Sequence, residues 1–204
     1  MDESDKYKTI KSLSQGLYKE KGSRFIAFAY PVSTQEEIKI IIEKIRKEHH
    51  EARHHCFAYM IGQDRLTWRI NDDGEPTGTG GKPILGQINS FGLTNILIVV
   101  SRYFGGTLLG VSGLINAYKT AAASAIGNAE IVERTLMEFH EISYPYDSMN
   151  AVMKILKDEN VGQSGQDFNL ECRVKINFRV SAREKILTRL SRIDGLRDRY
   201  IEIL

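Results

Sequence analysis

The sequence lacks any apolar run of the roughly 18 residues that a membrane-spanning helix needs. Its longest apolar run, ILIVV at residues 96–100, suits a single buried strand. The chain starts with the acidic segment MDESD, and no apolar stretch follows it, so the pattern is not that of a secretory signal. We therefore expect a cytoplasmic protein that has no membrane partner.

Cysteine is also scarce, and this bears on the redox compartment. Cys56 and Cys172 lie far apart in the sequence and form no CxxC motif. Two such cysteines in a chain without an export signal are expected to be reduced and buried. The sequence therefore predicts no disulfide framework.

The composition is that of a folded protein, with 42% hydrophobic and 26% charged residues. The 204 residues suffice for two domains of about 100 residues, each with its own core. The net charge of +2 is uneven: residues 171–200 hold nine Lys/Arg and four Asp/Glu, hence +5, which leaves −3 elsewhere. Attraction to a polyanion is therefore predicted for the C-terminal end.

The first half of the chain mixes strand and helix patterns. Strands are predicted at residues 7–10, 23–32, 55–61, 66–70 and 95–102. The segment Thr34-Gln35-Glu36-Glu37 is a capping box, and it opens a helix whose isoleucines at positions 38, 41, 42 and 45 share one face. Two further helices are predicted, from Pro83 to about residue 91 and at residues 111–127.

The second half contains the same pattern twice, a strand, a helix and a strand. The predicted strands lie near residues 133–144, 163–168, 172–180 and 199–204, and the two helices have apolar faces around Val152 and Ile186. Two such units in about 70 residues are the ferredoxin-like plan, βαββαβ. We predict an α+β chain of two domains, residues 1–130 and residues 131–204.

A histidine cluster, His49-His50 and His54-His55-Cys56, first suggests metal or nucleophile chemistry. A zinc site needs three or four converging ligands, whereas strand alternation sends His54 and Cys56 to one face and His55 to the other. Neighbouring strand residues are also poorly placed to act as a nucleophile and its base. We expect no metal and no catalytic residue here. A buried structural cysteine is predicted, with one histidine facing the core or the Asp72/Asp73 loop and the others solvated.

The acidic, glycine-rich loop at residues 72–82, DDGEPTGTGGK, leaves several roles open. It differs from a phosphate loop, because Pro83 stands where Ser or Thr should follow the lysine. Its glycines lead into a helix and can present free amides to an anion. Its acids can alternatively hold a hard divalent cation with bound water, or cap turns and pair with Arg69 or Arg102. The residues concerned in the cation hypothesis are Asp72, Asp73 and Glu75.

A second glycine loop, residues 102–110, follows a buried strand and precedes a helix. Ligand crevices in α/β sheets form at such positions. The Arg102 guanidinium matches phosphate or carboxylate, and glycines let a ligand approach the backbone. An aromatic side chain here can stack on a base, although core packing is favoured for Phe104. We predict that both loops lie side by side as the main concave site of the first domain. The candidate ligand-binding or anion-binding residues are Arg102, Tyr103, Gly105, Gly106, Asp72, Asp73, Glu75, Lys82 and His54.

Several ordered segments together resemble the YigZ/IMPACT family. They are HHCFAY at 54–59, DDGEPTGT at 72–79, GGKPIL at 80–85, ILIVV at 96–100, RYFGG at 102–106 and LG at 109–110. The resemblance covers residues 22–125, and the remainder looks like the extra C-terminal domain of bacterial members. It implies two α/β sandwiches: the first is similar to the left-handed-crossover second-domain fold of a small-subunit ribosomal protein, and the second is ferredoxin-like.

The resemblance also bears on function. The domain pairing looks like the fourth and fifth domains of EF-G, which touch the ribosome. Eukaryotic members act in translational control with an additional N-terminal domain, so that role is not transferred to this chain. The family brings no settled catalytic residues.

We predict a cytoplasmic factor that binds RNA or the ribosome and modulates translation, without a resident cofactor. Its nucleic-acid candidates lie on a helix predicted at residues 182–193, where Lys185, Arg189 and Arg192 align and Arg179 and Arg183 extend the patch. They are expected to contact phosphates with little sequence preference. The alternatives are a hydrolase or transferase for a small phosphate-bearing or carboxylate-bearing molecule, using the acidic loop and Arg102, and a plain protein–protein module.

Overall fold

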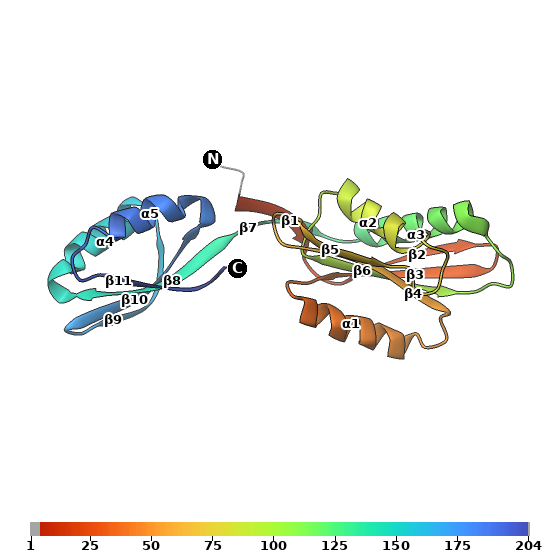
Figure 1. The fold of residues 1–204 in the computed structure, drawn as a ribbon, viewed down its shortest axis with the longest axis horizontal. Coiled ribbons are helices and arrows are strands. Elements are labelled where there is room, and N and C mark those ends of the chain that lie inside the picture. Colours follow the sequence, from red (N-terminus) through yellow and green to blue (C-terminus); the bar gives the residue numbers. More distant parts are fainter. Residues whose placement is uncertain (1–4, 204) are drawn as a thin grey trace. The chain divides into compact units, whose positions relative to one another are not determined.

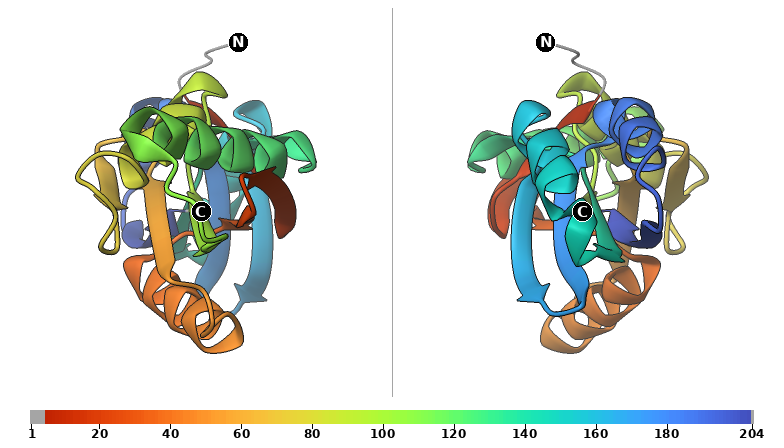
Figure 2. Two further views of the ribbon diagram at one scale, coloured as in Figure 1. Left: turned by 90° about the vertical axis from the view of Figure 1, so that its right-hand side faces the viewer. Right: turned by 90° about the vertical axis from the view of Figure 1, so that its left-hand side faces the viewer.

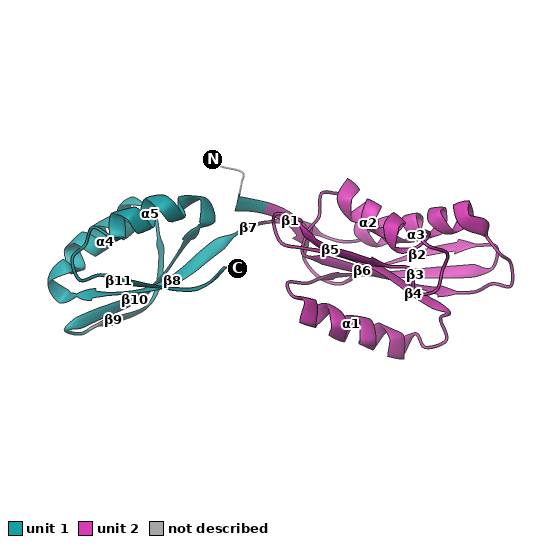
Figure 3. Cartoon of the chain, in the orientation of Figure 1, with its two compact units in different colours: residues 1–6, 135–204 teal, residues 7–134 magenta. Residues whose placement is uncertain are grey.

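The computed structural model describes residues 5–203 and divides into two compact units (Figures 1 and 3). The N-terminal unit comprises residues 7–134, and the C-terminal unit comprises the rest of the chain, with Asp5 and Lys6 counted in it. Asp5 belongs there because its carboxylate accepts a hydrogen bond from the Ser181 N–H at 2.9 Å. The division lies a few residues later than the predicted boundary at residue 130.

The N-terminal unit contains a five-stranded antiparallel sheet in the order β2-β3-β6-β4-β5. The strands are β2 (Ser14–Glu20), β3 (Ser23–Pro31), β4 (His54–Ile61), β5 (Thr67–Asn71) and β6 (Ile96–Tyr103). Helix α1 (Gln35–Glu48) covers one face, and α2 (Gly81–Ser90) and α3 (Gly110–Gly127) cover the other (Figures 1 and 2). A separate ribbon pairs β1 (Lys6–Ile10) with β7 (Ile131–Thr135).

The sheet separates two apolar cores, one against α1 and one against α2 and α3. The central strand β6 is buried from both sides, as its continuous run of five apolar residues predicted. The capping box of α1 is also confirmed: the Thr34 hydroxyl accepts from the Glu37 N–H at 3.2 Å, and the Glu37 carboxylate accepts from the Thr34 N–H at 3.3 Å. Ile38 and Ile45 of α1 face the core as expected.

The C-terminal unit is ferredoxin-like, as predicted, with four antiparallel strands in the order β11-β8-β10-β9. Its elements are β8 (Met137–Pro145), α4 (Met149–Asp158), β9 (Gly162–Phe168), β10 (Glu171–Arg179), α5 (Arg183–Leu190) and β11 (Arg197–Ile203). Alternate residues of β8 and β10 pack under the helices, among them Ile142 and Val174. Helix α5 ends at Leu190, three residues before the predicted end at Ile193, because the chain continues in tight turns.

No helix in the described part of the chain is both long enough and apolar enough to span a bilayer.

Candidate functional site

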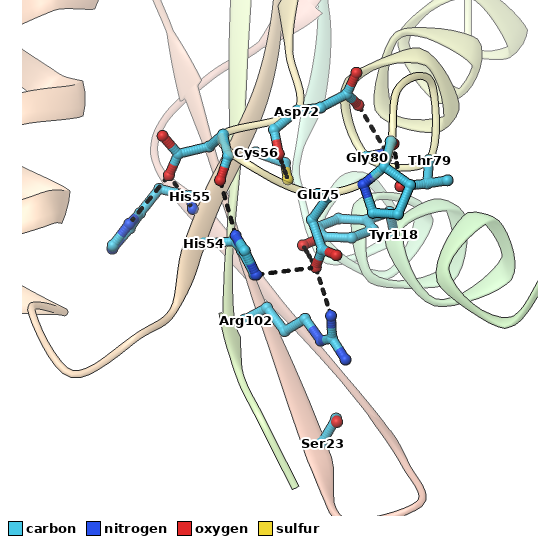
Figure 4. Close-up of polar contacts among 12 residues, drawn as sticks. Ser23, His54, His55, Cys56, Asp72, Glu75, Thr79, Gly80, Arg102 and Tyr118 are labelled. Carbon is cyan, nitrogen blue, oxygen red and sulfur yellow. Dashed lines mark hydrogen bonds and ion pairs between the residues drawn. The ribbon is translucent and has the colours of Figure 1, made fainter. Parts of the chain in front are cut away.

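The loops after β5 and β6 lie side by side, as predicted, and a buried ion pair joins them (Figure 4). Arg102, near the end of β6, donates from Nη1 to Oε1 of Glu75 at 2.6 Å. The Tyr118 hydroxyl of α3 donates to the same oxygen at 2.8 Å, and His54 Nε2 lies 3.9 Å from it. The side chains of Arg102 and Glu75 are only 6% and 3% exposed. Of the two roles left open for Arg102, the structure therefore shows the salt bridge to the acidic loop.

Two nucleophilic side chains lie close to Glu75, but burial makes both poor nucleophiles. Desolvation raises the pKa of the Cys56 thiol and of the Tyr118 hydroxyl, so both stay protonated near neutral pH. The Cys56 thiol donates to the Asp72 carbonyl at 3.0 Å. Cys56 is thus the buried, free cysteine that was predicted. Neither group provides the accessible nucleophile that a hydrolase or transferase would use.

The Asp72 carboxylate accepts hydrogen bonds from backbone N–H groups of the glycine-rich segment that follows it. Its Oδ1 accepts from the N–H groups of Gly80 and Gly81 at 2.9 and 2.8 Å, and its Oδ2 accepts from Gly78 at 2.8 Å. These amides surround the N-terminus of α2, where an external anion was the alternative partner. The expectation of free amides was wrong here, because the chain supplies its own carboxylate to them.

The three acids of this loop have separate partners. Asp73 accepts from Arg46 Nη2 at 2.6 Å and from the His55 N–H at 2.7 Å, whereas Asp72 binds amides and Glu75 binds Arg102. Within residues 5–203, no three His, Cys, Asp or Glu side chains group so that they could hold a metal ion. The arrangement gives no support to a divalent cation shared by Asp72, Asp73 and Glu75.

More histidines of this cluster have hydrogen-bond partners than the sequence suggested. His54 Nδ1 lies 2.8 Å from the Asp73 carbonyl, and His55 Nε2 lies 3.2 Å from the His49 carbonyl. His49 Nδ1 is 2.8 Å from the Tyr103 hydroxyl. Only His50 has the predicted exposed position. The expectation that a single histidine would be held was wrong, because the end of α1 packs against the start of β4 and the end of β6.

Burial of His55 predicts a pH dependence of stability. Desolvation lowers the pKa of His55 below its ordinary value of 6.5, so the folded state holds it neutral. The stability that neutral His55 gives to the folded state is therefore fully present above pH 6.5. It is lost as the pH falls below 6.5 toward the lowered pKa of the folded state. We expect His55→Asn to lessen the loss of unfolding free energy between pH 7.5 and pH 5, measured by urea titration. The exposed His50→Gln should keep the wild-type slope, and an unchanged slope in His55→Asn would contradict this assignment.

A pocket of about 310 Å³ opens between the two loops and the start of α3. Its lining residues are Arg53, His54, Gly74, Glu75, Pro76, Arg102, Phe104, Leu108, Leu109, Gly110, Val111 and Leu114. Phe104 is 39% exposed, so the expectation that it packs in the core was wrong. It forms part of the pocket wall, with the Arg53 guanidinium carbon 5.6 Å from its ring centroid. The sequence pattern did not single out Arg53, because a lone arginine before a strand resembles any surface residue.

The remaining candidates of this site do not all meet in the pocket. Tyr103 lies outside the lining, with the Arg24 guanidinium carbon 4.8 Å above its ring. Gly105 packs against the backbone of Gly22 in the β2–β3 turn, so its small size serves the chain rather than an approaching ligand. Gly106 is exposed, and its positive φ of 86° explains the glycine. Lys82 is exposed in the first turn of α2 and does not line the pocket.

The basic residues predicted for nucleic acid are partly neutralised in the fold. Lys185 pairs with Glu159 at 2.7 Å, and Arg189 pairs with Glu159 and with Asp158, at the end of α4. Arg183 lies 3.4 Å from Glu138. Arg192 follows the end of α5 rather than extending its face. Arg179 and Arg192 remain as exposed cations without an ion pair in the described part of the chain.

The net charge counted over each whole unit differs from the charge of the basic segment alone. Residues 135–204 hold 11 Lys/Arg and 11 Asp/Glu, hence zero net charge, because acids of residues 135–170 and Glu202 balance the basic segment. Residues 7–134 hold 16 Lys/Arg and 12 Asp/Glu, hence +4. Counted over whole units, the net positive charge therefore lies in the N-terminal unit, and attraction of a polyanion to the C-terminal end stays a prediction.

Comparison with known proteins relates this arrangement to one family. The model of the Impact N-terminal domain matches residues 21–126. The IMPACT family member YvyE of Bacillus subtilis is 38% identical over 74% of this chain and 70% of its own length. The IMPACT family member YigZ of Escherichia coli is 36% identical over 67% and 68%. A solved structure described as a hypothetical protein has a TM-score of 0.70 at 27% identity, with 97% of this chain and 98% of that chain covered.

Proposed function

Because the chain belongs to the IMPACT family, we propose that it is a binding factor that contacts RNA or the ribosome and thereby modulates translation. The proposal combines the role in translation that membership of this family implies with one observation on the N-terminal unit. That observation is a pair of exposed arginines, Arg24 and Arg53, each placed over an aromatic ring at the end of β6.

These two arginines are suited to bind phosphate. Neither makes an ion pair with a carboxylate within residues 5–203, and both belong to the unit whose net charge is +4. A guanidinium that lies over a ring is held in place by cation–π attraction, while its N–H groups remain available for phosphate oxygens. Lys21, exposed in the β2–β3 turn next to Gly105, adds a further cation nearby. This arrangement favours the N-terminal unit as the main contact with RNA.

Exchanging both arginines for alanine should weaken RNA binding with little effect on folding. Loss of two phosphate contacts should lower the slope of log affinity against log salt concentration by about 1.4, at roughly 0.7 for each contact with a single strand. The measurement is fluorescence anisotropy with a labelled single-stranded RNA over a salt series, together with co-sedimentation with ribosomes at low salt.

The matched control removes two cations from the C-terminal unit, in the double variant Arg179→Ala and Arg192→Ala. It should keep most of the affinity. If it instead loses binding and the Arg24/Arg53 variant does not, the contact lies beside α5, where the sequence pattern predicted it. If the wild type binds neither RNA nor ribosomes at low salt, the proposed function is wrong.

A further inference from the structure

The pocket that Arg53 lines has a composition suited to a flat apolar ring. Its lining includes the rings of Phe104 and Pro76 and the aliphatic side chains of Leu108, Leu109 and Leu114. Leu108, Val111 and Phe104 are 82%, 58% and 39% exposed, so several exposed apolar side chains gather at this pocket, as they do at interaction sites. A volume of about 310 Å³ lies at the small end of the range for ligand pockets, which suits one ring system rather than an extended ligand.

Three polar side chains that contact one another also line this pocket. Arg102, Glu75 and His54 all line it, and they are joined through Oε1 of Glu75 as Figure 4 shows. Arg102 Nε is buried and has no hydrogen-bond partner in the described residues. Buried donors without an acceptor are uncommon in folded proteins. A few polar groups beneath apolar walls are the usual composition of a site that orients a small heterocycle.

An exposed arginine in the lining brings positive charge to this pocket. Arg53 lines it with its guanidinium over Phe104, and Glu75, the one carboxylate among the described residues of the lining, is already paired with Arg102. A ligand that combines a flat ring with a negative charge outside the pocket therefore fits better than a purely apolar one. A nucleotide of a single strand has this combination, with its base inside and its phosphate at the rim.

We propose that this pocket receives one unstacked base of single-stranded RNA, with Phe104 as the stacking surface and Arg53 as the contact to the adjoining phosphate. The proposal rests on the RNA-binding function above and specifies which surface takes a base. It adds an interaction with the base to the phosphate contacts, so the affinity should depend on the presence of bases as well as on charge.

The test compares two labelled probes of equal length and charge, a hexamer of uridine and a hexamer of abasic ribose phosphate. The wild type should bind the uridine hexamer about tenfold more tightly, because stacking of a base on an aromatic side chain has about that effect. Phe104→Leu should remove most of this difference, because only the uridine probe has bases to stack, whereas any effect of losing the ring beside Arg53 falls equally on both probes. Phe91→Leu is the matched control, since Phe91 is 40% exposed and lies outside the pocket.

Each further outcome is decisive. Equal binding of both probes by the wild type would overturn the base pocket and leave the proposed phosphate contacts intact. Loss of ribosome co-sedimentation in Phe104→Leu with unchanged binding of both RNA probes would assign the pocket to a protein partner and overturn the base as its occupant. Failure of the wild type to bind either probe or ribosomes would reject the proposed function itself. Unfolding curves followed by the fluorescence of Trp68 establish that each variant is folded.

Discussion

Replacing Arg102 with alanine is expected to lower the free energy of unfolding of the N-terminal unit by about 3–5 kcal/mol. Glu75 would then keep a buried negative charge, and among the described residues Tyr118 would remain as its close hydrogen-bond donor. The cost comes mainly from that uncompensated charge, since burial of an ion without its partner is strongly unfavourable. A role in ligand binding alone would leave the unfolding free energy nearly unchanged.

The measurement follows urea unfolding through Trp68, the only tryptophan, which lies in β5 and therefore reports on the N-terminal unit. Arg53→Ala is the control, because Arg53 is exposed and should change stability by less than about 0.5 kcal/mol. The double variant Arg102→Met with Glu75→Leu should regain part of the loss, since apolar pairs often replace buried ion pairs without penalty. A loss below about 1 kcal/mol in Arg102→Ala would show that the pair is not structural.

Replacing Gly105 with alanine is expected to destabilise the N-terminal unit by about 1–3 kcal/mol, the usual cost of overpacking. A Cβ at this position would lie 1.9 Å from the carbonyl carbon of Gly22 and 2.2 Å from the Ser23 nitrogen. Both are backbone atoms, so no side chain can rotate away, and the loop must move. Since Phe104 is the preceding residue, its ring and the pocket wall should move too.

Gly86→Ala is the matched control for this change. Gly86 lies in α2, and a Cβ added there meets no heavy atom within 4 Å. Alanine also favours a helix over glycine by up to about 1 kcal/mol, so this variant should be neutral or more stable. The comparison uses Trp68 fluorescence during urea unfolding and affinity for the uridine hexamer. Equal stability of the two variants would contradict the close packing of Gly105 on the turn.

The sequence by itself determined the features that depend on short-range pattern. The capping box at Thr34 requires only residues three apart. The apolar run of β6 needs burial on both faces wherever it lies, and the repeated strand–helix–strand pattern leads to the ferredoxin-like unit. Strand β2 was missed because its pattern of apolar residues is weak, and its place at the sheet edge depends on the close approach of Gly16 to α3.

Only the tertiary structure decided the partners of the charged and polar groups. Arg102 meets Glu75 from 27 positions away, and Asp72 reaches the amides before α2 because the loop folds back on itself. Lys185 and Arg189 of α5 pair with Glu159 after α4, so two cations that the sequence pattern assigned to phosphate have partners within the fold. The energy of an ion pair falls with the distance between the charges and is screened by salt. It therefore depends on contacts between segments distant in sequence, which only the folded chain creates.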